Sequence, residues 1–163
     1  MSGEQGRTAV VNVLGGAWLG ASLITAAVVA PAAFEQLPSR TLAGNLVGAV
    51  LPTVFVSGII IAGVVLLLGL AGKKPNGGHR WRSVAAFAWA AACIIAQFVV
   101  NARVARIRAS LPGPIETLSP TDPLRLEFGR MHGLSVGLLG VAMLAAVVVV
   151  LLTSLSRPTA NAG

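Results

Sequence analysis

Long stretches of apolar residues alternate with short polar connections along this chain. The four apolar stretches cover residues 8–30, 42–71, 81–100 and 133–155. A helix needs about 20 consecutive apolar residues to cross the hydrocarbon core of a bilayer, and each stretch reaches that length. The pattern therefore predicts an all-α, polytopic membrane protein in which a four-helix transmembrane bundle forms one domain over residues 1–163. The expected spans are about 8–30, 42–71, 81–104 and 126–155.

The first apolar stretch is expected to be a retained span and not a cleaved signal peptide. Arg7 and the small residues around Ala30 resemble parts of a signal sequence, but the stretch exceeds the roughly 7–15 apolar residues that such signals carry. Thr8 is a suitable N-cap. The helix is expected to end at Ala30, because Pro31 disfavours helical geometry in the residue before it.

The third and fourth helices are expected to extend beyond the bilayer. The third can continue to Leu111, which makes it about 46 Å long at the usual helical rise, against about 30 Å of hydrocarbon. The fourth can begin at Asp122 and Pro123, as N-cap and first helical residue. We expect the two extensions to pair as antiparallel neighbours, where Arg103, Arg106 and Arg108 can meet Glu127 or Glu116.

The composition excludes a water-soluble globular protein. Of the 163 residues, 55% are hydrophobic and 10% are charged, whereas soluble domains average about 25% charged residues. The net charge of +7 comes from residues that flank the apolar stretches, which fits attraction to the anionic lipids of a bilayer. No basic helix with interleaved aromatic residues occurs, so we exclude nucleic acid as a partner.

Pairs of glycines four residues apart occur in three of the predicted spans. These pairs are Gly16 and Gly20, Gly44 and Gly48, and Gly133 and Gly137. Lipid supplies no hydrophobic drive between helices, so small residues that permit close backbone approach are typical of helix–helix contacts. We expect at least two of these pairs to be helix-packing sites, although glycine is also simply common in such sequences.

The orientation in the membrane follows only weakly from charge. Lysine and arginine are equally numerous on the two sides, so the positive-inside rule gives no direct answer. The basic segment 73–82 contains no acidic residue, whereas the arginines on the other side are interleaved with acids. We therefore expect cytoplasmic termini in the cell (inner) membrane.

Polar residues at one membrane face form the best candidate site. The antiparallel topology brings together a candidate polar cluster that consists of Glu35, Arg40, Asn101, Arg103 and His132. Intramembrane polar residues are functional suspects by default. Each also has a structural explanation: His132 as an interfacial hydrogen-bonding residue, Arg103 as a snorkelling anchor, and Glu35 as the ion-pair partner of Arg40.

Several chemistries are disfavoured by the residues present. Only one histidine lies near a span, so one chain does not supply two axial haem ligands. Cys93, Glu35 and His132 lie at different depths, which argues against zinc. Hydrolase and phosphate-binding motifs are absent, and all five acidic residues lie outside the four apolar stretches, against ion-coupled transport. We expect no enzyme activity, no catalytic residue, no metal and no cofactor.

Motifs in both halves of the chain resemble those of a known family. The first half carries the segment 30–38 and Leu51-Pro52-x-x-Phe55, and the second carries Asn101 and the segment 128–135. These motifs resemble the bacterial four-pass domain-of-unknown-function family, which is related to a eukaryotic small transmembrane protein linked to platinum-drug resistance. Leu51 stands where that family usually has an aromatic residue. The resemblance implies an integral membrane protein without an established activity.

Two functional hypotheses remain. The first is a small bundle with a binding or transport-accessory role, in which the polar cluster lines a surface-facing pocket. The alternative is a structural or accessory subunit in a larger membrane complex or homo-oligomer, whose glycine faces dock other transmembrane helices. An enzyme that acts on lipid is disfavoured, because no nucleophile–base pair is recognisable.

Overall fold

The computed structural model describes residues 3–70 and 77–155 of the chain, and these residues form helices without any strand. The elements are α1 (Gly3–Ile24), the π-helix η1 (Thr25–Val29), α2 (Ala30–Gln36), α3 (Arg40–Leu70), α4 (Gly77–Ile94), the π-helix η2 (Ile95–Val100), α5 (Asn101–Ala109), the 3₁₀ turn η3 (Ile115–Thr117) and α6 (Pro123–Leu155). Ala71 of the second expected span and Lys73 and Lys74 of the basic segment lie outside the described residues.

Four continuous helices are long and apolar enough to cross a membrane: Gly3–Gln36, Arg40–Leu70, Gly78–Ala109 and Pro123–Leu155. The predicted all-helical, four-pass fold is therefore confirmed. All four helices, and not only the third and fourth, exceed the residues needed for the hydrocarbon core. The shortest has 31 residues, or about 46 Å at the usual rise per residue.

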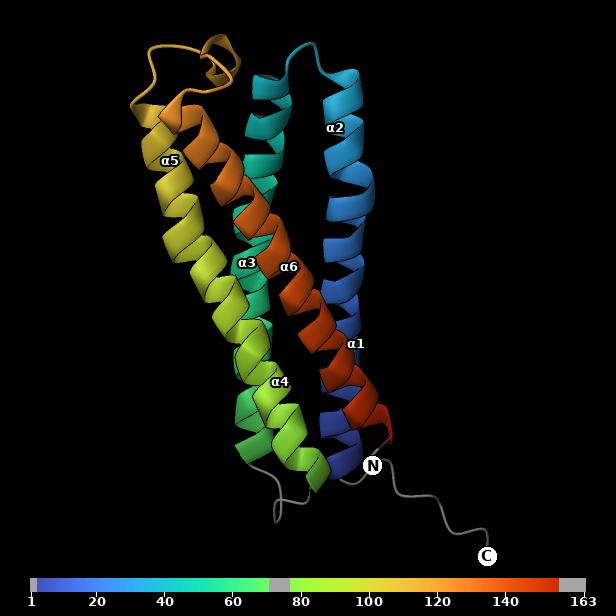
Figure 1. The fold of residues 1–163 in the computed structure, drawn as a ribbon. Helices are drawn as coiled ribbons and strands as arrows, with labels where there is room; N and C mark the ends of the chain where they lie inside the picture. Colours follow the sequence, from blue (N-terminus) through green and yellow to red (C-terminus); the bar gives the residue numbers. More distant parts are fainter. Residues whose placement is uncertain (1–2, 71–76, 156–163) are drawn as a thin grey trace, which may run out of the picture.

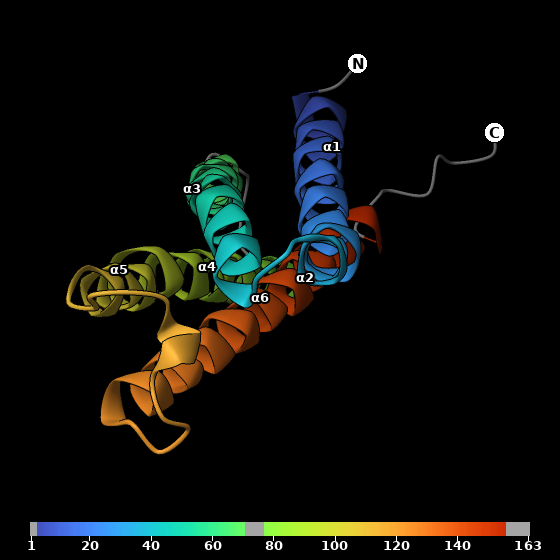
Figure 2. The same ribbon diagram turned by 90° about the horizontal axis from the view of Figure 1, so that it is seen from above.

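The helices pack more tightly at one end of the bundle than at the other. The start of α1, the end of α3, the start of α4 and the end of α6 gather at the lower end in Figure 1. At the other end, α5 and the start of α6 lie apart from α2, as the view from above in Figure 2 shows. The connections 37–39 and 110–122 lie at this second end.

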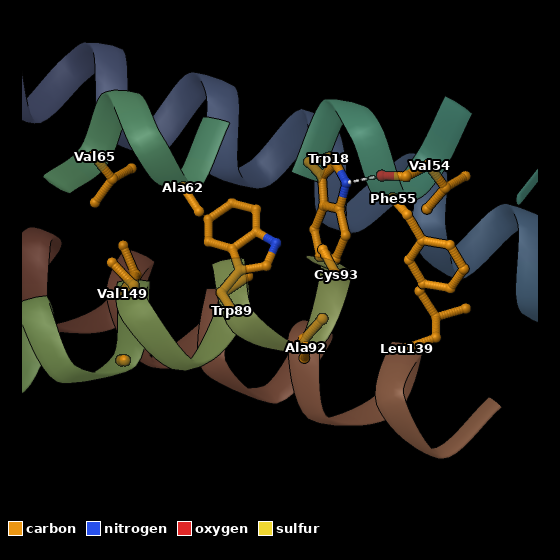
Figure 3. Packing of buried hydrophobic residues seen from close by; sticks show 14 of the residues in the cluster. Trp18, Val54, Phe55, Ala62, Val65, Trp89, Ala92, Cys93, Leu139 and Val149 are labelled. Atoms are coloured by element: carbon orange, nitrogen blue, oxygen red, sulfur yellow. Dashed lines mark hydrogen bonds between the residues drawn. The ribbon is translucent and has the colours of Figure 1, made fainter. Parts of the chain in front are cut away.

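The core lies where α1, α3, α4 and α6 meet. Trp18 and Trp89 place their ring centroids 4.8 Å apart, with ring planes inclined by 48°. The indole N–H of Trp18 donates a 2.9 Å hydrogen bond to the carbonyl of Val54, which joins α1 to α3. Figure 3 shows both rings inside a cluster that includes Phe55 and Cys93. Large apolar side chains such as Leu67, Phe87 and Leu144 face outward, as expected of helices surrounded by lipid.

The first helix does not end at Ala30, so that prediction is wrong. It passes through Pro31 and ends at Gln36. A π-helical stretch precedes the proline, and the Ala30 amide donates to the carbonyl of Thr25, five residues back. Proline has no N–H to donate within a helix. Because the wider π turn shifts the hydrogen-bond register just before Pro31, this missing donor lies where the regular pattern is already interrupted, and the helix continues.

The ends of the other predicted extensions agree closely with the structure. The third helix ends at Ala109, two residues before the expected Leu111. The fourth begins at Pro123, and a side-chain oxygen of Asp122 accepts a 2.8 Å hydrogen bond from the amide of Leu124. Asp122 thus caps the helix as predicted. An ion pair of 2.5 Å between Arg103 and Glu127 joins α5 to α6.

The glycines at which helices approach most closely differ from the predicted pairs. A Cβ atom added to Gly58 would lie 2.8 Å from the Cys93 sulfur and 3.0 Å from the Trp18 ring. A Cβ on Gly15 would lie 2.8 Å from a methyl carbon of Val150. These two positions require glycine because neighbouring helices occupy the space of a side chain.

The predicted pairs in the first and fourth spans do not bring helices of this chain together. The residues concerned are Gly16, Gly20, Gly133 and Gly137, and a Cβ atom on any of them would have no described neighbour within 4 Å. They lie on exposed helix faces. Spacing in the sequence gives the distance between two glycines but not the side of the helix that faces the core, which explains the difference.

Gly58→Ala is expected to destabilise the bundle by about 1–3 kcal/mol, because the new methyl group overlaps a packed sulfur and a packed ring. The measurement is unfolding in mixed micelles with increasing sodium dodecyl sulfate, followed by circular dichroism. Gly16→Ala is the matched control and is expected to stay within about 0.5 kcal/mol of the wild type. Equal stabilities of the two variants would contradict the packing described here.

Candidate binding groove

A groove opens at the end of the bundle where α5 and α6 lie apart from α2. Its volume is about 1120 Å³, and its walls come from α2, α3, η2, α5, the 110–122 connection and the first half of α6. The groove exists because the close contacts around Gly58 and the two tryptophans are not repeated here. Side chains, and not backbone, therefore determine its chemistry.

The lining of the groove combines apolar and polar side chains. The apolar group includes Phe34, Leu51, Phe98, Leu111 and Phe128. The polar and charged group includes Arg40, Thr41, Asn45, Gln97, Asn101, Arg108, Glu116, Arg125, His132 and Ser135. A mixed lining of this kind is typical of sites in which apolar walls enclose a ligand and a few polar groups orient it.

Arg108 crosses the groove from α5 to α3. Its Nη2 atom donates a 3.1 Å hydrogen bond to the carbonyl of Gly44, and its Cζ atom lies 5.5 Å from the centroid of the Phe128 ring on α6. The residue is half-buried. A cation over an aromatic face is attracted by the ring quadrupole, so this single side chain of α5 contacts both α3 and α6.

Gly44 and Gly48 make room for the Arg108 guanidinium. A Cβ atom on Gly44 would lie 3.3 Å from Nη2, and one on Gly48 would lie 3.1 Å from Nη1. This glycine pair therefore faces another helix, as expected, but an arginine head fills the space and not a helix backbone. The absence of two methyl groups on α3 lets the charged head rest against the helix.

The 110–122 connection is tied to the start of α3 through Glu116. The Thr41 hydroxyl donates to Glu116 Oε2, and the Thr41 amide donates to Oε1 at 3.4 Å. The side-chain hydrogen bond from Thr41 lowers the pKa of Glu116 below its ordinary value of 4.5. Arg125 supports the same connection by donating a 2.6 Å hydrogen bond to the carbonyl of Leu118.

The π-helix η2 carries Gln97, and Asn101 follows it as the first residue of α5; both side chains line the groove. The amide of Asn101 donates to the carbonyl of Ala96, five residues back. Its side-chain nitrogen donates a 3.1 Å hydrogen bond to Gln97 Oε1. π-helical turns occur frequently at functional sites, and here one lies beside the groove.

Three residues of the predicted polar cluster line the groove and two do not. Arg40, Asn101 and His132 are lining residues. Glu35 is exposed at the end of α2, and it forms no ion pair with Arg40 in the described parts of the chain. Arg103 lies outside the lining and is held by Glu127.

Sequence reasoning missed the central role of Arg108 and the involvement of Thr41, Glu116, Arg125 and Phe128. One signal was available: Arg108 falls on the same side of the third helix as Gln97 and Asn101. All three residues line the groove. The Thr41–Glu116 contact joins residues 75 positions apart and has no signature in the sequence.

The groove offers no ready-made metal centre. Across residues 3–70 and 77–155, no three His, Cys, Asp or Glu side chains are grouped as metal ligands would be. The polar groups that line it are mainly guanidinium, amide and hydroxyl groups, which donate hydrogen bonds. The arrangement is therefore chemically suited to hold an acceptor-rich group by hydrogen bonds.

Comparison with known proteins adds one relationship. A family profile described as domain of unknown function (DUF4149) matches residues 13–111, more than half of the chain. The match ends before α6, so the segment 128–135 lies beyond it. No curated protein and no solved structure shows significant similarity to the chain.

Thr41→Val is expected to raise the pKa of Glu116 towards 4.5, because the largest cause of its lowering is the hydrogen bond from the Thr41 hydroxyl. In the wild type, the contact stabilises the folded state above the ordinary carboxyl pKa, and this contribution disappears as pH falls through the lowered value. The measurement is the ¹³C carboxyl shift of labelled glutamate in micelles. Thr117→Val, in the same connection, is the control and is expected to leave this pKa unchanged. An unchanged pKa in Thr41→Val would contradict the assignment.

Proposed function

Since this chain belongs to the DUF4149 family, whose domain has no known function, we propose a function from the groove itself: the protein is a small membrane bundle that binds an amphipathic ligand. The observation that carries the proposal is a cavity of about 1120 Å³ whose lining is both apolar and charged. Ligand pockets typically measure about 300–1,000 Å³, so the groove has room for a sizeable molecule.

The lining arginines lie nearer the end of the bundle than part of its apolar wall. Arg40 is the first residue of α3, and Leu51 lies eleven positions later, which corresponds to about 16 Å along the helix. Phe98 precedes Arg108 by a similar distance on the third helix. Apolar surface is also present beside the arginines, because Phe128 lies against Arg108 and Leu111 follows it in the lining. A molecule with a polar head and an apolar body can place its head beside the arginines and its body along Leu51 and Phe98.

The proposed role is binding, either alone or as an accessory to transport, without catalysis and without a cofactor. We propose the cell (inner) membrane as its location, with the termini in the cytoplasm and the bilayer itself as the first partner. We also propose the kinship with the eukaryotic small transmembrane protein linked to platinum-drug resistance. It is supported by the segments 30–38 and 128–135 of this chain.

The alternative proposal is an accessory subunit of a larger membrane assembly or homo-oligomer. It is favoured by the exposed faces around Gly16 and Gly20 on α1 and Gly133 and Gly137 on α6, where the described residues leave the space of a side chain empty. Small residues on a lipid-facing surface permit close approach of another helix. The two proposals are compatible, because none of these four glycines is a lining residue of the groove.

Filling the groove tests the binding proposal. Ala105 is exposed and lines the groove, so Ala105→Trp is expected to displace an amphipathic ligand without disturbing the packed core. The measurement is mass spectrometry of lipids and other amphiphiles that remain on the full chain after purification in a neutral detergent. The expected result is at least a fivefold loss relative to the wild type.

Ala49→Trp is the matched control for this experiment. Ala49 is exposed on α3 but does not line the groove, so this variant is expected to retain what the wild type retains. The binding proposal is wrong if the wild type carries no amphiphile above the level found on an unrelated membrane protein. Equal retention in the two tryptophan variants also contradicts it.

Extraction in mild detergent followed by native sizing tests the alternative. A subunit is expected to migrate in an assembly larger than one chain. Gly16→Leu combined with Gly137→Leu is expected to release the single chain, because the larger side chains prevent close approach of another helix. A single chain at every detergent concentration, for the wild type as well, would contradict the subunit proposal.

A further inference from the structure

The cationic head of Arg108 lacks a counter-charge. Within the described parts of the chain, no carboxylate lies within ion-pair distance of its guanidinium, and the one hydrogen bond that it donates goes to the Gly44 carbonyl. A guanidinium carries five N–H donors. Four of its N–H groups thus have no hydrogen-bond acceptor among the described residues, although the residue is half-buried.

Partial burial makes this charge a strong attractor for an anion. Removing a charge from water is costly unless an opposite charge or a set of hydrogen bonds compensates. Here the compensation is one carbonyl and the face of Phe128. Interactions between charges are stronger in a region from which water is partly excluded, so an anion beside Arg108 would be held more firmly than on an open surface.

The one acidic side chain that lines the groove is already occupied. Glu116 accepts hydrogen bonds from both the hydroxyl and the amide of Thr41 at the first turn of α3. The first turn of a helix favours negative charge because its N–H groups and dipole point outward. Glu116 therefore compensates the start of α3, and of the three lining arginines only Arg125 contributes to the lowering of its pKa.

The charges that line the groove are consequently unbalanced. Three arginines, Arg40, Arg108 and Arg125, share the lining with the single carboxylate of Glu116. Arg40 is exposed and forms no ion pair with any residue that the structure describes. The residual positive charge lies at the end of the helices, beside apolar walls that include Phe98 and Leu111.

We propose that the groove selects anionic amphiphiles, and that Arg108 binds a phosphate or carboxylate head while the apolar chain lies along Phe98 and Leu51. The inference rests on the proposed binding function and adds the chemical class of the ligand. Guanidinium groups bind phosphate and carboxylate through paired hydrogen bonds. The lipid headgroups of a bilayer carry the same oxyanions, so both a membrane lipid and a free single-chain amphiphile belong to this class.

Photolabelling with three matched probes tests the inference. Each probe carries the same dodecyl chain with a terminal diazirine, and the heads are phosphate, carboxylate and neutral glucoside. The full chain in neutral detergent is irradiated with each probe, and labelled residues are identified by mass spectrometry. We expect either anionic probe to label the groove at least tenfold more than the neutral probe, because a charge-assisted hydrogen bond contributes about this factor.

Arg108→Gln is expected to reduce the preference for anions to less than about twofold, while the neutral probe still labels the groove. Arg106→Gln is the matched control, because Arg106 lies on the same helix, is exposed and does not line the groove. It is expected to keep the tenfold preference. Loss of the preference in both variants would show a general charge effect and would overturn the role of Arg108.

Gly48→Ala provides a second variant if Arg108→Gln does not fold. A Cβ atom at this position lies 3.1 Å from Nη1 of Arg108, so the methyl group moves the guanidinium without removing its charge. The preference for anionic probes is expected to fall by at least threefold. An unchanged preference in a folded Gly48→Ala protein would overturn the inference.

The remaining outcomes separate this inference from the proposal on which it rests. If the neutral probe labels the groove as strongly as the anions, the groove binds amphiphiles and the anion inference is wrong. If no probe labels the groove, the binding proposal itself is wrong. If inorganic phosphate at the probe concentration abolishes labelling by the phosphate probe, the ligand is a free anion and the amphiphile assignment is wrong.

Discussion

Close contact between α1, α3 and α4 at Gly58 determines how the rest of the bundle is arranged. In lipid, two apolar helix faces gain little by leaving their surroundings, so association depends on dispersion and hydrogen bonds between well-fitted surfaces. Gly58 supplies such a surface, because the Trp18 ring and the Cys93 sulfur both lie where its side chain would be. The Trp18 hydrogen bond to Val54 adds a polar contact to the same junction.

The same kind of contact does not form at the other end of the helices, because the residues there are too polar and too large. Gln97, Asn101 and Arg108 occupy the face of the third helix that would have to approach α3. Polar contacts join the elements at this end: Arg108 with the Gly44 carbonyl, Thr41 with Glu116, and Arg103 with Glu127. The groove therefore results from tight packing at one end of the bundle and from polar side chains that keep the helices apart at the other.

The sequence was sufficient to predict the fold, because each apolar stretch has the length that a helix needs to cross a bilayer. The capping of α6 by Asp122 also followed from local spacing. The Arg103–Glu127 pair is one of several pairings that the sequence allowed between three arginines and two glutamates. The position of the candidate-site residues along the bundle axis was also predictable, since the topology alone places Arg40, Asn101 and His132 at one end.

Which side of each helix faces its neighbours was less predictable. Gly15 and Gly16 are adjacent in the sequence, yet only Gly15 lies against another helix. Arg103 and Arg108 are five residues apart, and only Arg108 reaches the groove. Which of these neighbours faces inward depends on the packing of the whole bundle, and small residues and arginines carry too weak a pattern to reveal it.

The path of the first helix also bears on the charge of the groove. The sequence predicts an ion pair between Glu35 and Arg40, but the helix continues through Pro31 after the π turn at Thr25–Val29, and Glu35 lies exposed on α2 and is not a lining residue. Glu116 is then the one carboxylate among the lining residues, and Thr41 already holds it. Arg40 and Arg108 therefore have no ion-pair partner among the described residues, and the proposed selectivity for anions depends on this imbalance.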